Sequence, residues 1–514
     1  ERCTCRERDR IRYFSRLSGP ILDRVDMQLQ VCPVSHIGSR QLPEGDSSER
    51  IRQQVIAARP MAVERFRSFG WTSNAQAAGS WLREHTPHRV LAVVNQALSS
   101  YQISLRGAYR VMKLSWTICD LDGRTSPNLD DVDMTALTHQ TTSQSHTAPA
   151  QPTLSAKALL QSDDEALARM LLTHCSECAN ALMTSLLKGC DSEHPGVEAL
   201  RALLMVACAT TEQEQRRARN TLECMFILGT ARWGRKARSE GVASFQLASQ
   251  RWIGRLLQLP TFDPDALCAL FTGQGAYTVV IPGSPYWPES LEDLDVRSDW
   301  APPLALWVQG DATALTSCDR PVSIVGSRGV NEYGRHVARN LACQTALNGH
   351  LVVSGGAMGI DAAAHWGALE AMNQLGAKVA GRTVAIFAGG LDHCGPTTNM
   401  RLFEQICAQH GALVSECTPS TIPEPRRFLL RNRLIAALAY SVVVAQARLR
   451  SGALNTAGWA NEMNRRLFAV PGEITTPAHA GCNRLIADQQ ASLLSSTSDI
   501  EQLCHETHAP SIRP

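Results

Sequence analysis

The sequence lacks a strong charge of either sign. Its 514 residues include 50 Lys and Arg against 48 Asp and Glu, which gives a formal net charge of +2. The whole chain therefore has no field that would attract a polyanion, and any nucleic-acid site must be a local basic pocket. The sequence also lacks a signal peptide and any apolar run near the ~18 residues that a membrane span needs. We therefore expect a cytoplasmic protein that does not enter a membrane.

Motifs of nucleotide-dependent enzymes are missing as well. No GxxxxGK[ST] string occurs, so the sequence contains no P-loop. Gly356 and Gly359 have the spacing of a dinucleotide-binding GxGxxG loop, but Ser354 stands at its first glycine position. No acidic residue follows at the ~20-residue distance expected for a ribose contact, and no nucleophile–base pair or carboxylate dyad is evident. The sequence predicts no catalytic residue, no cofactor and no enzymatic activity.

Cysteine is abundant, with 17 residues, but its spacing is irregular. Cys175 and Cys178 form one CxxC without a second pair, and Cys3 and Cys5 form a CxC near the first residue, which is Glu1 and not Met. A closed zinc site needs four ligands, usually from two such pairs. Buried or surface thiols in a reducing cytosol are the simpler interpretation, and we predict no metal site.

The length suggests about three domains. Residues 1–137 form an Arg-rich first segment, and residues 138–155 are polar and contain proline without periodicity, which indicates a linker. Apolar residues three and four apart predict a helical domain over 156–268. Within it, the RRAR run at 216–219 is either a DNA-binding patch or, as we favour, a solvated helix face. Residues 496–514 are expected to form a C-terminal tail.

Between residues 269 and 495, short apolar strands alternate with amphipathic helices. The expected strands include PVSIVG, HLVVSGG, TVAIFAGG, ALVSEC, SVVVAQA and LFAVPG. Such an order is typical of parallel strands that are covered by helices on both faces. We therefore predict an α/β fold with a doubly wound, Rossmann-like parallel sheet, preceded by the helical domain.

Ligands bind such a sheet beyond the carboxyl ends of its strands, so the residues that follow each strand are the candidates. Glycine lets the backbone approach a phosphate, arginine donates a charged fork to phosphate oxygens, and phenylalanine offers a face to a base. Arg431 and Arg433 are expected at the start of a helix, where a cation is unfavourable unless an anion lies nearby. Asp361 is expected to cap its helix turn or to hydrogen-bond within it, and His365 to pack in the core. The candidate DNA-binding residues are Gly326, Ser327, Arg328, Ser354, Gly355, Gly356, Phe428, Arg431, Asn432, Arg433, Ser451 and Gly452.

The strings IVGSRGVNEYG, VVSGGAMGIDAAAHWGAL, FLLRNRLIAALA, SGALNTAGWA and RLFAVPG resemble the DNA-processing protein A (DprA/Smf) family, in family order. The resemblance implies a single-stranded-DNA pocket in the Rossmann-like domain and a small SAM-like helical domain before it. It further implies a homodimer that loads a RecA-type recombinase onto incoming strands during natural transformation. The sequence departs from the family at Leu429, where proline is usual, and at Gln446, where glutamate is usual. It departs again at Cys394, where a Tyr-Pro pair usually stands.

The first segment has a resemblance of its own. The strings RYFSRLSGPILDRVDMQLQV and SLRGAYRVMKLSWTICDLDG are similar to the C-terminal part of the magnesium-chelatase-like AAA+ family, which includes the competence helicase ComM. The resemblance implies that Arg24 would reach a neighbouring subunit's nucleotide and that Arg106 would be a lid sensor. Two interpretations stay open, namely a fusion remnant that forms a helical appendage and an AAA+ lid supplied to another chain.

Two other function classes compete with a DNA-binding mediator. A phosphoribohydrolase on the same fold would carry a PGGxGT loop and a nearby glutamate, but neither Gly355-Gly356 nor Gly389-Gly390 continues into that string. An AAA+ ATPase subunit would need the Walker motifs that this sequence lacks.

Overall fold

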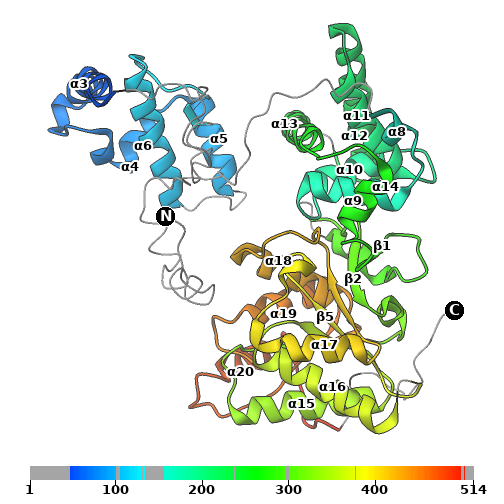
Figure 1. The fold of residues 1–514 in the computed structure, drawn as a ribbon. Coiled ribbons are helices and arrows are strands. Elements are labelled where there is room, and N and C mark those ends of the chain that lie inside the picture. The colour runs from blue at the N-terminus through cyan, green and yellow to red at the C-terminus, as the bar shows by residue number, and fades with distance from the viewer. Residues whose placement is uncertain are drawn as a thin grey trace. The chain divides into compact units, whose positions relative to one another are not determined.

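The computed structural model describes residues 47–99, 105–129, 131–132, 156–236, 238–296, 300–376, 378–498 and 503. The chain divides into two compact units, residues 1–148 and 149–514 (Figure 1). The predicted linker at 138–155, Cys3, Cys5, Arg24 and most of the predicted tail lie outside the described residues, apart from 496–498 and 503 of the tail.

The described part of the first unit is helical. Its α-helices are α3 (Ser48–Arg65), α4 (Gly79–His85), α5 (His88–Ser99) and α6 (Leu105–Leu121). Aromatic side chains form the centre of its core: the ring of Trp81 lies 4.7 Å from that of Phe66 and 5.2 Å from that of Trp116. The Arg65 guanidinium pairs with Asp120 and lies 4.3 Å from the Trp116 ring. Arg106 belongs to the first turn of α6.

The second unit begins with a group of helices. They are α8 (Ala156–Gln161), α9 (Glu165–Ser176), α10 (Ala181–Lys188), α11 (Pro195–Cys208), α12 (Glu212–Arg232), α13 (Ser239–Leu257) and α14 (Pro264–Phe271). Local sequence sets their starts: Thr211 and Glu214 form a capping box at α12, and Pro195 occupies the first turn of α11. Arg216 of the RRAR run is exposed on α12 and pairs with Glu212 of the same helix, as on a solvated face.

A nine-stranded sheet follows, with the strand order β1-β2-β6-β5-β4-β3-β7-β8-β9. From β6 to β9 all neighbouring strands are parallel, whereas β2 runs antiparallel to β6 and β1 antiparallel to β2. The predicted α/β fold is therefore confirmed, and the predicted parallel sheet is found from β6 to β9, whereas the antiparallel pairing of β1 and β2 was not predicted. The strands are β1 (Thr278–Val280), β2 (Leu306–Gly310), β3 (Val322–Gly326), β4 (Val352–Gly355), β5 (Thr383–Ile386), β6 (Ala412–Ser415), β7 (Ser441–Gln446), β8 (Arg466–Ala469) and β9 (Ser492–Leu493).

Helices cover both faces of this sheet. The helices α15 (Glu332–Leu347), α16 (Ile360–Leu375) and α17 (Met400–Ala408) pack on one face. The helices α18 (Pro425–Ala437) and α19 (Gly452–Glu462) pack on the other face, and α20 (Ala480–Ala487) packs against β7 and β8. Side-chain alternation along a strand explains the division, because Ile324 joins the core under α15 and α16 while its neighbour Val325 joins the core under α18 and α19.

The order of the strands creates a switch point between β3 and β7. From β3 the chain moves outward through β4, β5 and β6, and it then returns to place β7 on the other side of β3. The loops after β3 and β7 therefore lead to helices on opposite faces, and a crevice opens between them.

The helical group and the sheet share one core inside the second unit. Leu171 of α9 and Phe271 of α14 belong to the same buried cluster as Trp307 of β2. The Trp307 indole N–H donates to the Phe271 carbonyl oxygen at 2.8 Å, and buried Arg169 donates to the Leu304 carbonyl oxygen at 3.3 Å. Among the described helices, none is both long enough and apolar enough to cross a membrane.

Candidate functional site

A cavity of about 470 Å³ lies at the switch point of the sheet. It is bounded by the loops after β3 and β7, by the first turn of α16 and by one side of α18. Crevices at this position are where open α/β sheets bind their ligands. The residues around it are Val325, Gly326, Ser327, Arg328, Gly329, Ala357, Asp361, Phe428, Leu429, Arg431, Asn432, Ile435, Arg448, Arg450, Ser451, Gly452, Ala453 and Thr456.

Arg431 is the buried cation of this cavity. Its side chain comes from α18 and is only 6% exposed, and two of its guanidinium nitrogens, Nε and Nη1, have no hydrogen-bond partner. Burial lowers the pKa of Arg431, and the positive charge of Arg328 lowers it further, while Asp361 opposes both effects. A buried guanidinium with unused donors is unfavourable, so an anion entering the cavity would be stabilised here.

Asp361 is the only carboxylate among the described residues that line the cavity. It lies in the first turn of α16 and is 6% exposed. Burial raises the pKa of Asp361, while Arg431, the Ala357 N–H, Arg328 and the Ser354 hydroxyl act in the opposite direction. Asp361 accepts the Ala357 N–H, just before the helix and not within its first turn, and it also provides the countercharge of Arg431. The cavity thus keeps an excess of positive charge.

Phe428 supplies an aromatic face beside the cations. The guanidinium of Arg328 lies 5.1 Å from the centre of the Phe428 ring. Both residues also line a second cavity of about 260 Å³, together with Arg431 and Ala357, so the two cavities adjoin. The second cavity has a more apolar lining, which includes Met358, Phe387, Pro396 and Pro423. An anion and a flat apolar group could therefore bind side by side.

Glycines allow the close approaches that build this site. A side chain at Gly355 would collide with the guanidinium of Arg431 and with the Asp361 carboxylate. At Gly359, φ is +86° and a Cβ would meet the carbonyl oxygen of Ser327, which accepts the Ile360 N–H at 3.2 Å. Gly355 therefore leaves space for Arg431 and Asp361, and Gly359 allows a backbone conformation that favours glycine.

The start of α19 forms the opposite wall. Ser451 caps this helix by accepting the N–H of Ala453, and Ser451, Gly452 and Ala453 all line the cavity. The Asn432 side-chain amide holds the loop by donating to the Gly452 carbonyl oxygen at 3.2 Å. The positive end of a helix dipole therefore faces the same cavity as the arginines, which favours an anion further.

The structure separates Arg433 from the other predicted site residues. Helix α18 begins at Pro425 and not near Asn432, so Arg431 and Arg433 both lie inside the helix and the expected conflict with its dipole does not arise. Residues two positions apart on a helix point roughly 200° away from each other. Arg433 consequently turns away from the cavity, is fully buried and pairs with Glu416. The structure therefore does not bring Arg433 to the cavity with the other predicted residues.

Ser354 and Gly356 support the site without lining the first cavity. The buried Ser354 hydroxyl donates to the Ile324 carbonyl oxygen at 2.6 Å, and Gly356 borders the second cavity. His365 is a packed core residue, as expected, and hydrogen-bonds with Thr383 and with the Gly355 carbonyl oxygen. Burial lowers the pKa of His365 to about 4, so the ring is neutral near pH 7.

Sequence reasoning missed Arg448 and Arg450. Both are exposed, line the cavity and lie directly between β7 and the cap of α19. Both residues follow a strand, so the rule that ligand-binding residues follow the strands would have selected them. The RLRSG string after β7 marks their place in the sequence. The cavity therefore carries four arginines against one carboxylate. Among the described residues, no group of three or more His, Cys, Asp or Glu side chains could hold a metal ion.

The fold and the cavity define a Rossmann-like α/β protein with a cationic, partly aromatic crevice at its switch point. The family described as DNA recombination-mediator protein A matches residues 278–505, which include the whole crevice. The C-terminal family of the magnesium chelatase subunit ChlI matches residues 45–139, and the family of that subunit itself matches residues 1–38.

Individual relatives agree with the first match. A putative DNA processing protein DprA from Mycobacterium tuberculosis is 45% identical over 198 residues, which are 38% of this chain and 48% of the relative. DNA processing protein DprA from Bacillus subtilis is 35% identical over 237 residues, 46% of this chain and 74% of the relative. A solved DNA processing protein A from Helicobacter pylori, described for its single-stranded DNA binding mode, is 30% identical, with a TM-score of 0.37 over 44% of this chain and 93% of that one.

The chain belongs to the DprA/Smf family of DNA processing proteins. It spans about half the length of the Mycobacterium tuberculosis relative that it matches.

Proposed function

We propose that the protein binds single-stranded DNA in the cavity at the switch point. The observation that carries this proposal is the buried Arg431, which lines the cavity together with Arg328 and has two guanidinium nitrogens without a hydrogen-bond partner. A phosphate accepts from such guanidinium groups, and the adjoining Phe428 ring offers a stacking face.

The same geometry favours a single strand over a duplex. Arg328, Arg431 and Phe428 line both cavities, so a phosphate and its base can bind side by side. In a duplex the bases are stacked and paired, and reaching Phe428 would cost the energy of unstacking. Contacts to phosphates and stacking contain no base code, so we expect little sequence preference.

Membership of the DprA/Smf family supports a role in handling incoming DNA. We infer that the protein is a cytoplasmic homodimer that protects strands during DNA uptake and recombination, and that a RecA-type recombinase is its partner. We also infer that it binds DNA without converting it chemically. Incubation with AMP-type nucleotides tests this last point, because a phosphoribohydrolase would release free base.

Fluorescence anisotropy with labelled oligo-dT and a matched duplex tests the binding site. We expect tighter binding to the single strand, and weaker binding after Arg328→Ala or Arg431→Ala. Each variant should flatten the slope of log K against log salt by about 0.7 to 1. Arg339→Ala is the control, since Arg339 is exposed on α15, pairs with Glu370 and does not line the cavity. Unchanged affinity in a folded Arg328→Ala/Arg431→Ala double variant would end the assignment.

A further inference from the structure

Glu177 gathers three arginines at the junction between the helical group and α18. It follows α9 and caps it in a left-handed conformation, with φ of 67°. Its carboxylate pairs with Arg255 of α13 and lies 3.7 Å from both Arg426 and Arg427 of α18. One carboxylate cannot neutralise three guanidinium groups, so positive charge is left over where the two parts of this unit meet.

Two of these arginines already have a structural task. Buried Arg427 donates to the Glu177 carbonyl oxygen at 3.1 Å, and Arg255 donates to the Cys175 carbonyl oxygen and to the Glu177 carboxylate. The bond from Arg427 holds the turn after α9 against the first turn of α18, and the bonds from Arg255 hold it against α13. Arg426 is different, because its side chain is 52% exposed and its charge contacts lie at 3.6 and 3.7 Å. It is available to a ligand in solution.

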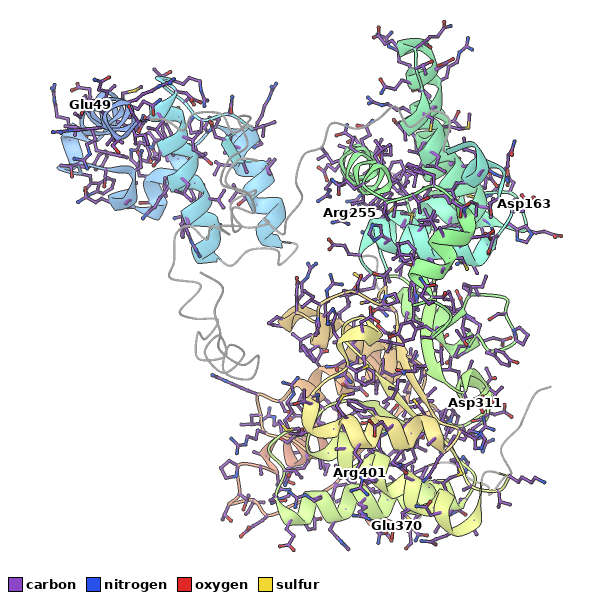
Figure 2. All side chains as sticks on the ribbon, in the orientation of Figure 1. Glu49, Asp163, Arg255, Asp311, Glu370 and Arg401 are labelled. Atoms are coloured by element: carbon purple, nitrogen blue, oxygen red, sulfur yellow. The ribbon has the colours of Figure 1, made fainter. Side chains whose placement is uncertain are left out.

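The surplus charge lies close to the proposed DNA site. Arg426 is in the first turn of α18, between Pro423 and Phe428, which both line the second cavity, although its side chain leaves the helix on a different side from that of Phe428. In the other direction, Arg251 is exposed on α13 one helical turn before Arg255, which Figure 2 labels on the helical part. We call Arg251, Arg255, Arg426 and Arg427 the α13–α18 strip. The carboxylates within 4 Å of these arginines, among the described residues, belong to Glu177 and Glu424.

The charge of the strip is a local property and not a consequence of a basic chain. The whole sequence has a formal charge of only +2. The strip has four arginines against two carboxylates, and the cavity beside it has four arginines against one. Such a group of cations, close to a cavity that is itself cationic, fits the phosphates of one flexible strand.

We propose that the α13–α18 strip binds the single strand where it leaves the cavity, so that the helical group lengthens the DNA-binding surface. This inference rests on the proposed function. Short oligonucleotides would fill the cavity alone, whereas longer ones would also lie across α18 and α13. The strip should therefore contribute to affinity only above a certain length of DNA.

The test compares an oligo-dT of about six nucleotides with one of about twenty, within and beyond the reach of a single site. The variant is Arg251→Ser/Arg426→Ser, which spares the clamping residues Arg255 and Arg427. Its matched control is Arg216→Ser/Arg217→Ser, which removes the same charge from an exposed part of α12. We expect the strip variant to bind the short oligonucleotide like the native protein. It should bind the long one about three- to tenfold more weakly at low salt, with a salt slope flattened by about 1.4.

Three results would each overturn the proposal for the α13–α18 strip. They are an equal loss of affinity for both oligonucleotides in the strip variant, no loss for either, and the same loss in the control variant. Loss of binding to a poly-glutamate probe with unchanged binding of the long oligonucleotide would also overturn it, and would indicate an acidic protein partner. If native protein bound neither oligonucleotide, the proposed function itself would fail, which is a separate result.

Discussion

Arg433 and Glu416 form an ion pair whose two side chains are 0% and 4% exposed, on the side of α18 turned away from the cavity. Arg431, two residues earlier, lines the cavity, and Arg433 does not. One helix therefore presents one arginine to the protein and another to the crevice. The separation follows from helix geometry, and it gives the two residues different expected roles.

The pair of Arg433 and Glu416 should matter for stability and not for DNA binding. Glu416→Gln leaves a fully buried guanidinium without its countercharge, which we expect to cost about 3–5 kcal/mol. Urea unfolding followed by circular dichroism measures this loss. Under conditions where the variant is folded, its salt slope for oligo-dT should equal that of the native protein. A flattened salt slope in the folded Glu416→Gln variant would indicate that Arg433 contributes to DNA binding.

Arg431 should show the opposite behaviour. Its burial beside Arg328 is unfavourable in the DNA-free protein, so the double variant Arg431→Met/Asp361→Asn, which removes both buried charges, should unfold at an equal or higher temperature. The same variant should bind oligo-dT more weakly, because the donors for the phosphate are gone. Calorimetry and anisotropy on one preparation check both effects. Reduced stability together with native affinity would show that Arg431 is structural.

The buried carboxyl group of Asp361 should make the binding of oligo-dT depend on pH. Because burial raises the pKa of Asp361, the folded protein holds this proton more tightly than the unfolded chain does. The contribution of Asp361 to stability therefore improves as pH falls through the raised pKa. The same protonation removes the only carboxylate among the described lining residues, while Arg328 and Arg431 stay charged, so affinity for oligo-dT should rise as pH falls.

Asp361→Asn is the matching variant. It should bind oligo-dT more tightly than the native protein near pH 7, and it should lose this part of the pH dependence. Anisotropy between pH 7 and pH 4.5 at constant ionic strength makes the comparison. His365 contributes little charge over most of this range, because its pKa is lowered to about 4. If the native protein and the Asp361→Asn variant had the same pH profile, protonation of Asp361 would not be the cause of the pH dependence of binding.

The sheet and much of the cavity could be predicted because their signals are local. Alternating apolar strands and amphipathic helices gave the parallel order from β3 to β8, and the residues after those strands include Arg328 and Ser451, which meet in one cavity. Each of these residues is placed by the end of its own strand. The prediction therefore needed no knowledge of contacts between distant parts of the chain.

Other parts of the site depend on contacts that a sequence pattern does not contain. The start of α18 at Pro425 decided which arginine faced the cavity, and the partner of Arg433 lies 17 positions away at Glu416. Gly355 was predicted to approach a phosphate, but its missing side chain leaves room for Arg431 and Asp361. The surplus charge around Glu177 was equally hidden, because it joins α9, α13 and α18.

Phe428 should contribute to binding in a way that salt does not alter. Stacking on an aromatic ring is worth about 1–3 kcal/mol per base, so Phe428→Ala should weaken oligo-dT binding by that amount without changing the salt slope. Removing the ring also takes away the surface over which Arg328 lies, so Phe428→Leu is a better matched variant that keeps an apolar side chain there. Phe428→Tyr is the control, and it should bind like the native protein. Anisotropy at several salt concentrations separates the two contributions. If Phe428→Leu bound as tightly as Phe428→Tyr, the ring would serve only to support Arg328, and bases would have to bind without stacking.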